Sequence, residues 1–341
     1  MNYKLRIYCF LLTSISVSCL KDNIVPIENI ELNDTAVIMR YIESTGDFAN
    51  TDLAPGLVSA EELFSNKTEY LILDIRTQLE YSSGHIDSAI NIKPIELYDL
   101  VDSLNLVNPS HKIVIISQNG QSSAFYVCLL RLTGFTNVYT LNYGMASWNM
   151  FFADEWISAL DNVDQLFTNT EYPKREFTNL PKLEFPNSLK TGHEKIIYRI
   201  KEIISKGFVE GTNYYKKFST NVELNNFLIC YGPVRLYNEF AIGGKGHPEN
   251  TVWFKDANLF EFRSVYSLQT LPNDHSILIY SGDGQLSACI VAYLTVLGYD
   301  VKTLLFGANQ LFYSRLNTEP ALADYVFSIQ NIMNYPYVTG K

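Results

Sequence analysis

The sequence predicts an α/β protein with two similar domains, each built on a central, mainly parallel sheet flanked by helices. The segment IISQNGQSSAFYVCLLRLTGF recurs as IYSGDGQLSACIVAYLTVLGY, so that Ser117 aligns with Ser281, 164 positions later. Each copy has the order apolar strand, short glycine-containing loop, helix, glycine, strand, which is the order of a right-handed βαβ unit. A repeat of this length indicates a duplicated domain, and 341 residues with 47% hydrophobic content suffice for two buried cores.

An export signal is the first element expected along the chain. Two basic residues precede an apolar run at residues 7–17, which is too short to span a bilayer as a resident helix. The small residues before Cys19 resemble the processing site of a bacterial lipoprotein, in which that cysteine is acylated. We therefore expect a signal peptide at residues 1–18, lipidation of Cys19 and a tether at residues 19–32. An ordinary signal peptide cut near Ser18 is the alternative.

The expected location is the bacterial cell envelope, with membrane attachment through this N-terminal lipid anchor. Lys21 and Asp22 resemble the export tag of some surface lipoproteins, which adds the outer-membrane surface as a narrower expectation. The chain has 26 basic and 36 acidic residues, a net charge of −10, so attachment by a polybasic patch is not expected. The same charge argues against a nucleic-acid partner, because binding to phosphates depends on Lys and Arg.

Three cysteines remain once Cys9 and Cys19 are assigned to the signal and the anchor. An odd number predicts no disulfide framework. Cys128 and Cys289 lie in apolar helical runs and are expected to be buried and inert. Cys230 ends a predicted strand, so a place near the domain surface is one hypothesis, but a structural cysteine is favoured because nothing charged beside it would activate the thiol. No metal site or cofactor is predicted.

The two copies are expected to share the same elements in the same order. Each opens with an amphipathic helix, at residues 37–42 and 196–204, whose apolar residues are expected to pack on the sheet. In the second copy Cys230 stands where the first has Asp74, and a loop is inserted after it. Three prolines among polar residues indicate a linker. The expected organisation is a first domain at 33–170, a linker at 171–187 and a second, diverged domain at 188–341.

A set of separated motifs resembles a rhodanese (sulfurtransferase) domain. In the first copy they cover most of residues 57–148 and comprise Asp74-Ile75-Arg76, Glu80-Tyr81, Gly84-His85-Ile86, Ala89, Asn91, a six-residue loop, Gly134-Phe135 and Gly144 to Trp148. The second copy keeps Gly246-His247, the loop and Gly298-Tyr299 within about residues 218–312. The resemblance implies two rhodanese-like domains. It also implies that Asp74 and Arg76, like His85 and His247, hold the fold together.

In that family, the first loop residue is a cysteine that carries sulfur as a persulfide. Backbone amides and the positive end of a helix would stabilise its thiolate. The corresponding loops here are Ser117, Gln118, Asn119, Gly120, Gln121 and Ser122, and Ser281, Gly282, Asp283, Gly284, Gln285 and Leu286. Serine replaces cysteine in both, and an oxygen cannot form a persulfide. A weak anion or carbonyl is still expected to bind to the backbone amides of the first loop. In the second loop, the negative charge of Asp283 is expected to disfavour anions.

The expected function is therefore a membrane-anchored tandem protein that is inactive as a sulfurtransferase and acts as a binding or scaffold module. Its partner would be an unknown protein or a small anionic or neutral ligand. The alternative is a working sulfurtransferase or sulfur carrier that uses Cys230, another thiol or a cysteine supplied by a partner. A serine hydrolase or phosphatase is the third hypothesis, but it would need a base and an orienting group.

Overall fold

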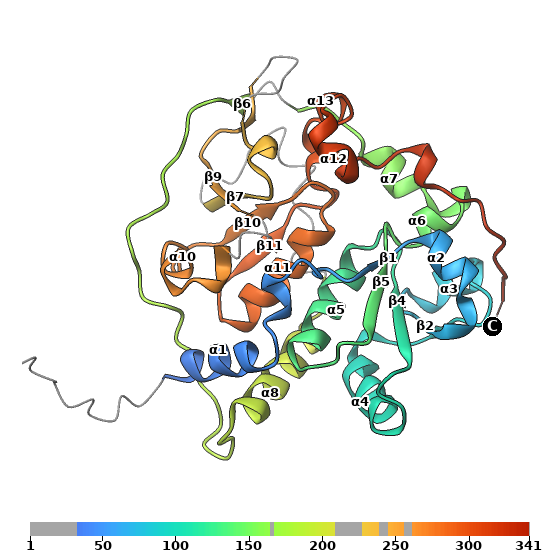
Figure 1. Ribbon diagram of the computed structural model, residues 1–341, viewed down its shortest axis with the longest axis horizontal. Coiled ribbons are helices and arrows are strands. Elements are labelled where there is room, and N and C mark those ends of the chain that lie inside the picture. Colours follow the sequence, from blue (N-terminus) through green and yellow to red (C-terminus); the bar gives the residue numbers. More distant parts are fainter. Residues whose placement is uncertain (1–32, 164–166, 209–226, 239–244, 256–260, 341) are drawn as a thin grey trace, which may run out of the picture. The chain divides into compact units, whose positions relative to one another are not determined.

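Two parallel sheets form the framework of the protein (Figure 1). The computed structural model describes residues 33–163, 167–208, 227–238, 245–255 and 261–340. The expected signal peptide, tether and Cys19 lie outside these ranges, and residues 33–341 form one compact unit. Within the described ranges, every helix is too short or too polar to span a membrane.

The first half of the chain forms a five-stranded sheet in the order β1-β5-β4-β2-β3, and every neighbouring pair is parallel. Its strands, in that order, are Leu57–Val58, Val138–Leu141, Lys112–Ile116, Tyr70–Asp74 and Ile90–Asn91. The central strands β4 and β2 are apolar on both faces because helices cover both sides. These helices are α1 (Asp34–Ser44), α2 (Ala60–Ser65), α3 (Gln78–Ser83), α4 (Leu97–Val107), α5 (Gln121–Leu132), α6 (Met145–Trp148) and α7 (Asp154–Ala159).

The second half repeats this plan with four strands in the order β11-β10-β7-β9, again all parallel. These strands are Val301–Thr303, Ile277–Tyr280, Phe227–Tyr231 and Thr251–Phe254. Its helices are α8 (Gly192–Lys206), α10 (Val265–Gln269), α11 (Gln285–Val296), α12 (Ala308–Leu311) and α13 (Tyr313–Leu316). The predicted fold class, with mainly parallel sheets flanked by helices, is confirmed.

Helices α5 and α11 pack against each other and join the two halves. Both are apolar around most of their circumference, which is the pattern of a helix buried on all sides. Each begins at the residue after the loop glycine, Gly120 or Gly284, which occupies the N-cap position, so the last two residues of each loop already belong to the helix. The βαβ units of the two halves therefore meet back to back along these helices.

The opening helices of the two copies also meet each other. Helix α1 packs on α8, Thr35 Oγ1 donates to the carbonyl of Pro181 at 2.6 Å, and Lys195 pairs with Asp34. Helix α8 starts with a capping box between Thr191 and Glu194 and buries its isoleucine face. These helices thus hold the halves together, and their most extensive contacts are with other helices and not, as expected from the sequence, with the sheets.

Two segments cross from one half to the other, and we call the described residues 161–163 and 167–172, together with residues 333–340, the exchanged segments. Val163 N donates to the carbonyl of Leu311 at 2.8 Å, and at the matching place Tyr335 N donates to the carbonyl of Trp148 at 2.8 Å. Further along, β6 (Phe167–Thr168) pairs with β8 (His247–Pro248), as Val338 pairs with His85. Each segment therefore completes the opposite half.

Candidate functional site

Ser117 follows β4 and begins the first loop, residues 117–122. Its Oγ accepts hydrogen bonds from the backbone amides of Gly120 at 3.1 Å and Ser123 at 3.3 Å. It also lies 2.9 Å from Ser123 Oγ, which in turn lies 2.6 Å from Thr140 Oγ1 on the neighbouring strand β5. Gly120 has φ +84°, a value that favours glycine and lets the loop turn its amides toward Ser117.

Ser281 and the second loop, residues 281–286, reproduce this geometry. The amides of Gly284 and Ser287 donate to Ser281 Oγ at 3.2 and 3.1 Å. Ser281 Oγ donates to Ser287 Oγ at 3.1 Å, and Ser287 Oγ in turn lies 2.7 Å from Thr303 Oγ1. The amides that would stabilise an anion therefore contact each serine's own oxygen in both loops.

Two glutamines, one from each loop, accept hydrogen bonds from the backbone of the opposite half. Gln285 Oε1 accepts from the amide of Tyr143 at 2.9 Å, and Gln121 Oε1 accepts from the amide of Phe306 at 2.8 Å. Both glutamine side chains are buried. Gln285 Nε2 also donates to Asn142 Oδ1 and Asp283 Oδ2, whereas Gln121 Nε2 has no partner among the described residues. The loops thus form a junction between the two sheets.

Two other side chains of the first loop form hydrogen bonds to residues outside the loop. Gln118 Nε2 donates to the carbonyl of Phe152 at 2.9 Å, and its Oε1 accepts from Arg76 Nη1 at 3.3 Å. Asn119 Nδ2 donates to Glu155 at 3.0 Å, while Ser122 remains partly exposed. Ser117 is consequently buried, although three residues of its loop are partly exposed.

The second loop is more deeply buried than the first. Gly282 lies against the ring of Tyr325, and within the loop only Leu286 is partly exposed. Asp283 is buried, and this burial raises the pKa of its carboxyl, while hydrogen bonds from Gln285 act in the opposite direction. The expectation that this loop disfavours anions stays a prediction.

Asp74 and Arg76 form a buried ion pair below the first loop. Arg76 Nη2 lies 2.7 Å from Asp74 Oδ2 and also donates to the carbonyl of Gly84 at 2.7 Å. Asn91 Nδ2 donates to the carbonyls of Asp74 and Arg76. The pair thus ties the end of β2 to the turn before β3 and makes no hydrogen bond to Ser117.

The two histidines of the Gly-His motifs hold backbone segments. His85 Nδ1 lies 2.9 Å from the carbonyl of Tyr81, and the two rings stack at 3.7 Å. His247 stacks on Tyr237 at 3.6 Å and contacts that residue's carbonyl at 2.6 Å and the carbonyl of Thr170 at 3.0 Å. Among the hydrogen bonds of the described residues, neither ring bonds to a loop serine, so neither is placed as a general base in this structure.

The hypothesis that Cys230 lies near the surface is wrong, and its burial fits the favoured role of a structural cysteine. Its strand β7 lies between β10 and β9, so neighbouring strands and the core cover its end, and Cys230 is fully buried. Burial raises the pKa of its thiol to about 12. Cys128 and Cys289 are buried in α5 and α11, as expected. The described residues contain no group of metal-ligating side chains.

Sequence reasoning missed several residues that complete the site. Ser123 and Ser287 match in the repeat, but their role as a second hydroxyl beside the loop serine follows only from the fold. Thr140 and Thr303 also occupy matching positions on the adjacent strands, so the shared spacing within the repeat was a usable signal. Tyr143 could not be found in this way, because its contact with Gln285 depends on how the halves meet.

Comparisons with known proteins agree with this geometry. A family model described as "Rhodanese-like domain" matches residues 59–151. The thiosulfate sulfurtransferase GlpE of Shewanella oneidensis is 31% identical over 81 residues, which are 23% of this chain and 74% of that protein. The protein of the same name from Pseudomonas fluorescens is 28% identical over 85 residues, or 25% of this chain and 75% of that protein.

Solved structures show the same kind of partial likeness. A rhodanese-related protein from Thermoplasma volcanium is 26% identical, with 29% of this chain and 90% of that chain covered and a TM-score of 0.23. A thiosulfate sulfurtransferase from Pseudomonas aeruginosa is 16% identical, with 79% of this chain and 46% of that chain covered and a TM-score of 0.28. The family model matches the first half only, so the likeness of the second half rests on the internal repeat and its matching loop geometry.

Proposed function

The chain belongs to the rhodanese-like sulfurtransferase family, and on this basis we propose that it is a tandem member without sulfurtransferase activity. It acts as a binding or scaffold module held at the bacterial envelope by a lipid anchor. Its partner is a protein or a small anionic or neutral ligand. The observation that carries the proposal is the presence of serine at the first position of both loops, Ser117 and Ser281.

The chemistry of the loops supports inactivity. Sulfur transfer through a persulfide requires a thiolate that attacks a sulfane sulfur and retains it. Ser117 and Ser281 offer oxygen instead, and the loop amides bond to that oxygen as they would to a thiolate. A hydroxyl is much harder to ionise than a thiol, so these amides alone do not make it a competent nucleophile.

The alternative, a sulfurtransferase that uses another thiol, has less support. Cys128, Cys230 and Cys289 are all fully buried, and the pKa of Cys230 is about 12. A thiol with so high a pKa carries almost no thiolate at neutral pH. Gln121 and Gln285 also accept hydrogen bonds from the backbone amides of Phe306 and Tyr143 in the opposite halves, which gives the loops a role in joining the halves that does not need sulfur.

Thiosulfate-to-cyanide turnover tests the proposal directly. The unmodified protein should give no turnover above a heat-denatured control, whereas sulfur transfer by the unmodified protein would favour the alternative. The variant Ser117→Cys then tests whether the loop amides still support the family's chemistry. A mass increase of one sulfur after exposure to thiosulfate would indicate a preserved cradle that lacks only its thiol.

The membrane anchor requires its own test, because Cys19 lies outside the described residues. Expression in a Gram-negative host should place the protein in the membrane fraction and label it with radioactive palmitate. Cys19→Ser should abolish both labelling and membrane association, while the nearby Ser18→Ala, which keeps a small residue before the cysteine, should change neither. Unlabelled protein that is still released from its precursor would support an ordinary signal peptide.

A further inference from the structure

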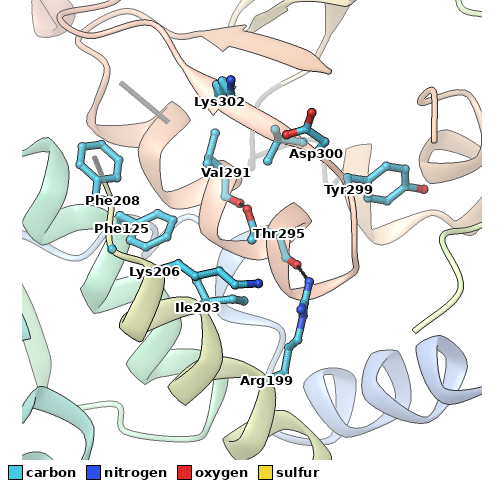
Figure 2. Close-up of a pocket in the computed structure, with 12 residues that line it drawn as sticks. Phe125, Arg199, Ile203, Lys206, Phe208, Val291, Thr295, Tyr299, Asp300 and Lys302 are labelled. Atoms are coloured by element: carbon cyan, nitrogen blue, oxygen red, sulfur yellow. Dashed lines mark hydrogen bonds between the residues drawn. The ribbon is translucent and has the colours of Figure 1, made fainter. Parts of the chain in front are cut away.

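A pocket of about 470 Å³ lies at the far end of α11 from the second loop (Figure 2). Phe125 of α5, Ile203 of α8, Val291 of α11 and Phe208, which follows α8, supply an apolar wall, and the Phe125 and Phe208 rings lie 5.2 Å apart. This volume and this mixture of apolar and polar lining are those of a small-molecule site. The lining residues all belong to the described part of the chain.

Three cations surround the pocket in a protein that is otherwise acidic. Arg199 and Lys206 extend from α8 and Lys302 from β11, while Asp300 is the only carboxylate among the lining residues (Figure 2). The whole chain carries a net charge of −10. The three cations outnumber the carboxylates Asp300 and Glu202, the second of which pairs with Arg199 and Lys206, and this difference favours an anionic over a cationic ligand. The charge of the lining residues therefore favours a negatively charged ligand.

Arg199 supplies a donor that the protein does not use. Its Nη2 donates to the carbonyl of Thr295 at 2.9 Å, and its Nη1 donates to Glu202 at 3.0 Å. These bonds fix the guanidinium at the pocket. Its Nε is buried and has no hydrogen-bond partner among the described residues. A buried guanidinium N–H without an acceptor is costly, which indicates that an acceptor is supplied from outside the chain.

In the first half, a side chain of the protein occupies the position that corresponds to this pocket. Arg131 occupies the repeat position of Thr295, and its guanidinium lies 4.5 Å from the ring of Phe48 and 4.7 Å from the ring of Tyr139. It also donates to the carbonyl of Val138 at 2.6 Å. In the second half, threonine replaces this arginine and Lys302 replaces Tyr139. The two changes remove the filling side chain and add a cation beside the space that it leaves.

We propose that this pocket binds a small organic anion with an apolar body, such as an aromatic or acyl carboxylate or sulfonate. The apolar part lies against Phe125, Phe208 and Val291, and the acidic head faces Arg199, Lys206 and Lys302. The site is separate from the serine loops, since Thr295 lies ten residues along α11 from Gln285. At the rise of an α-helix this is about 15 Å.

The test uses a matched pair of fluorescent probes on the purified full chain. Anilinonaphthalene sulfonate carries an aromatic body and an anionic head, and phenylnaphthylamine has the same rings without the sulfonate. The sulfonate should bind with one-to-one stoichiometry and at least about tenfold more tightly than the neutral probe, as expected for a hydrogen bond to a charged group. Equal affinity for both probes would overturn the proposal.

Variants then locate the bound probe. The double variant Lys206→Gln with Lys302→Gln should weaken sulfonate binding about tenfold and leave the neutral probe unchanged. Thr295→Phe, which fills the pocket without changing its charge, should weaken both probes. Lys201→Gln is the matched control, because Lys201 lies on the same helix but pairs with Asp99 outside the pocket.

Urea unfolding of each variant separates loss of the site from loss of the fold. If the double variant unfolds more readily than the wild type, Lys206→Gln alone replaces it, because this exposed lysine contacts only Glu202 in its hydrogen bonds. Sulfonate binding that survives both the charge change and Thr295→Phe would place the probe elsewhere on the protein and refute the assignment.

Discussion

Gln285 crosses from the second half of the chain and accepts a hydrogen bond at 2.9 Å from the backbone amide of Tyr143 in the first. Its repeat partner Gln121 makes the equivalent bond to Phe306 in the other direction. Both bonds are buried, so water does not replace them when they are lost. In the rhodanese-like fold of this chain, the loops that would hold a reactive thiol serve as the joint between its halves.

Substitution of the glutamines should show how much these bonds between the halves contribute to the free energy of unfolding. Gln285→Met keeps the side-chain length but removes the acceptor for Tyr143 and the bonds to Asn142 and Asp283. We expect a loss of about 2–3 kcal/mol in the free energy of unfolding, measured by urea denaturation. Gln121→Met should cost less, because Gln121 Nε2 has no partner to lose among the described residues. Equal losses would show that the extra bonds of Gln285 contribute little.

The loop glycines provide a second test. Gly120 and Gly284 have φ near +84° and +82°, and an added methyl group would contact the glutamine of the opposite loop. Gly120→Ala should therefore lower the free energy of unfolding by more than about 2 kcal/mol, through backbone strain and disruption of the joint. Gly134→Ala is the control, because Gly134 also has positive φ but has open space around it. A similar loss in both variants would mean that strain alone accounts for the effect.

Asp283 should make stability depend on pH. Burial raises its pKa, so the protonated carboxyl favours the folded state; this contribution is present below the ordinary pKa of 3.8 and is lost as the pH rises through the folded value. The wild type should therefore gain stability relative to Asp283→Asn as the pH falls from about 7 to about 4. Thermal unfolding of both proteins over this range provides the measurement. Parallel curves, or a wild type that loses relative stability toward low pH, would contradict the assignment.

The native thiols should be unreactive. Cys128, Cys230 and Cys289 are buried, and the pKa of Cys230 is about 12, so a disulfide reagent at about pH 8 should modify none of them in folded residues 33–341. The same sample should show three reactive thiols in urea. Rapid modification of Cys230 in the folded protein would revive the hypothesis of a sulfur carrier.

Cysteines introduced at the two loop positions should differ in reactivity. Ser117→Cys should react with iodoacetamide faster than Ser281→Cys by about tenfold, because the first loop has three partly exposed residues whereas the second is buried and carries Asp283. Urea-unfolded samples of the two variants serve as controls and should react at equal rates. A faster reaction at Ser281→Cys would show that the second loop is open in solution.

Much of the fold could be predicted because local patterns determine it. The apolar strand before Ser117, the glycine turn and the apolar helix recur around Ser281, and both copies form the expected parallel βαβ arrangement. Arg76, His85 and His247 contact neighbouring backbone, and the structural roles inferred for these residues and Asp74 stay predictions. The predicted domain boundaries stay a prediction.

What the sequence left open depends on contacts between distant segments. The strand position of Cys230 says nothing about the strands that cover it, so the predicted depth of this residue is wrong. The amides around Ser117 were expected to remain available to a ligand, but the serine oxygen and the Gln285 contact depend on packing that no local pattern records. The pocket between α8 and α11 could not be predicted for the same reason.

The exchanged segments have a consequence for any attempt to divide this protein. Residues 161–163 and 167–172 precede the second repeat in the chain but pair with its backbone, while residues 333–340 follow that repeat and pair with the first half. A chain truncated between the repeats would keep a strand with nothing to pair with and leave His85 and Trp148 without their cover. The duplication has therefore produced two halves that are each incomplete alone. Neither half is expected to fold as an independent domain.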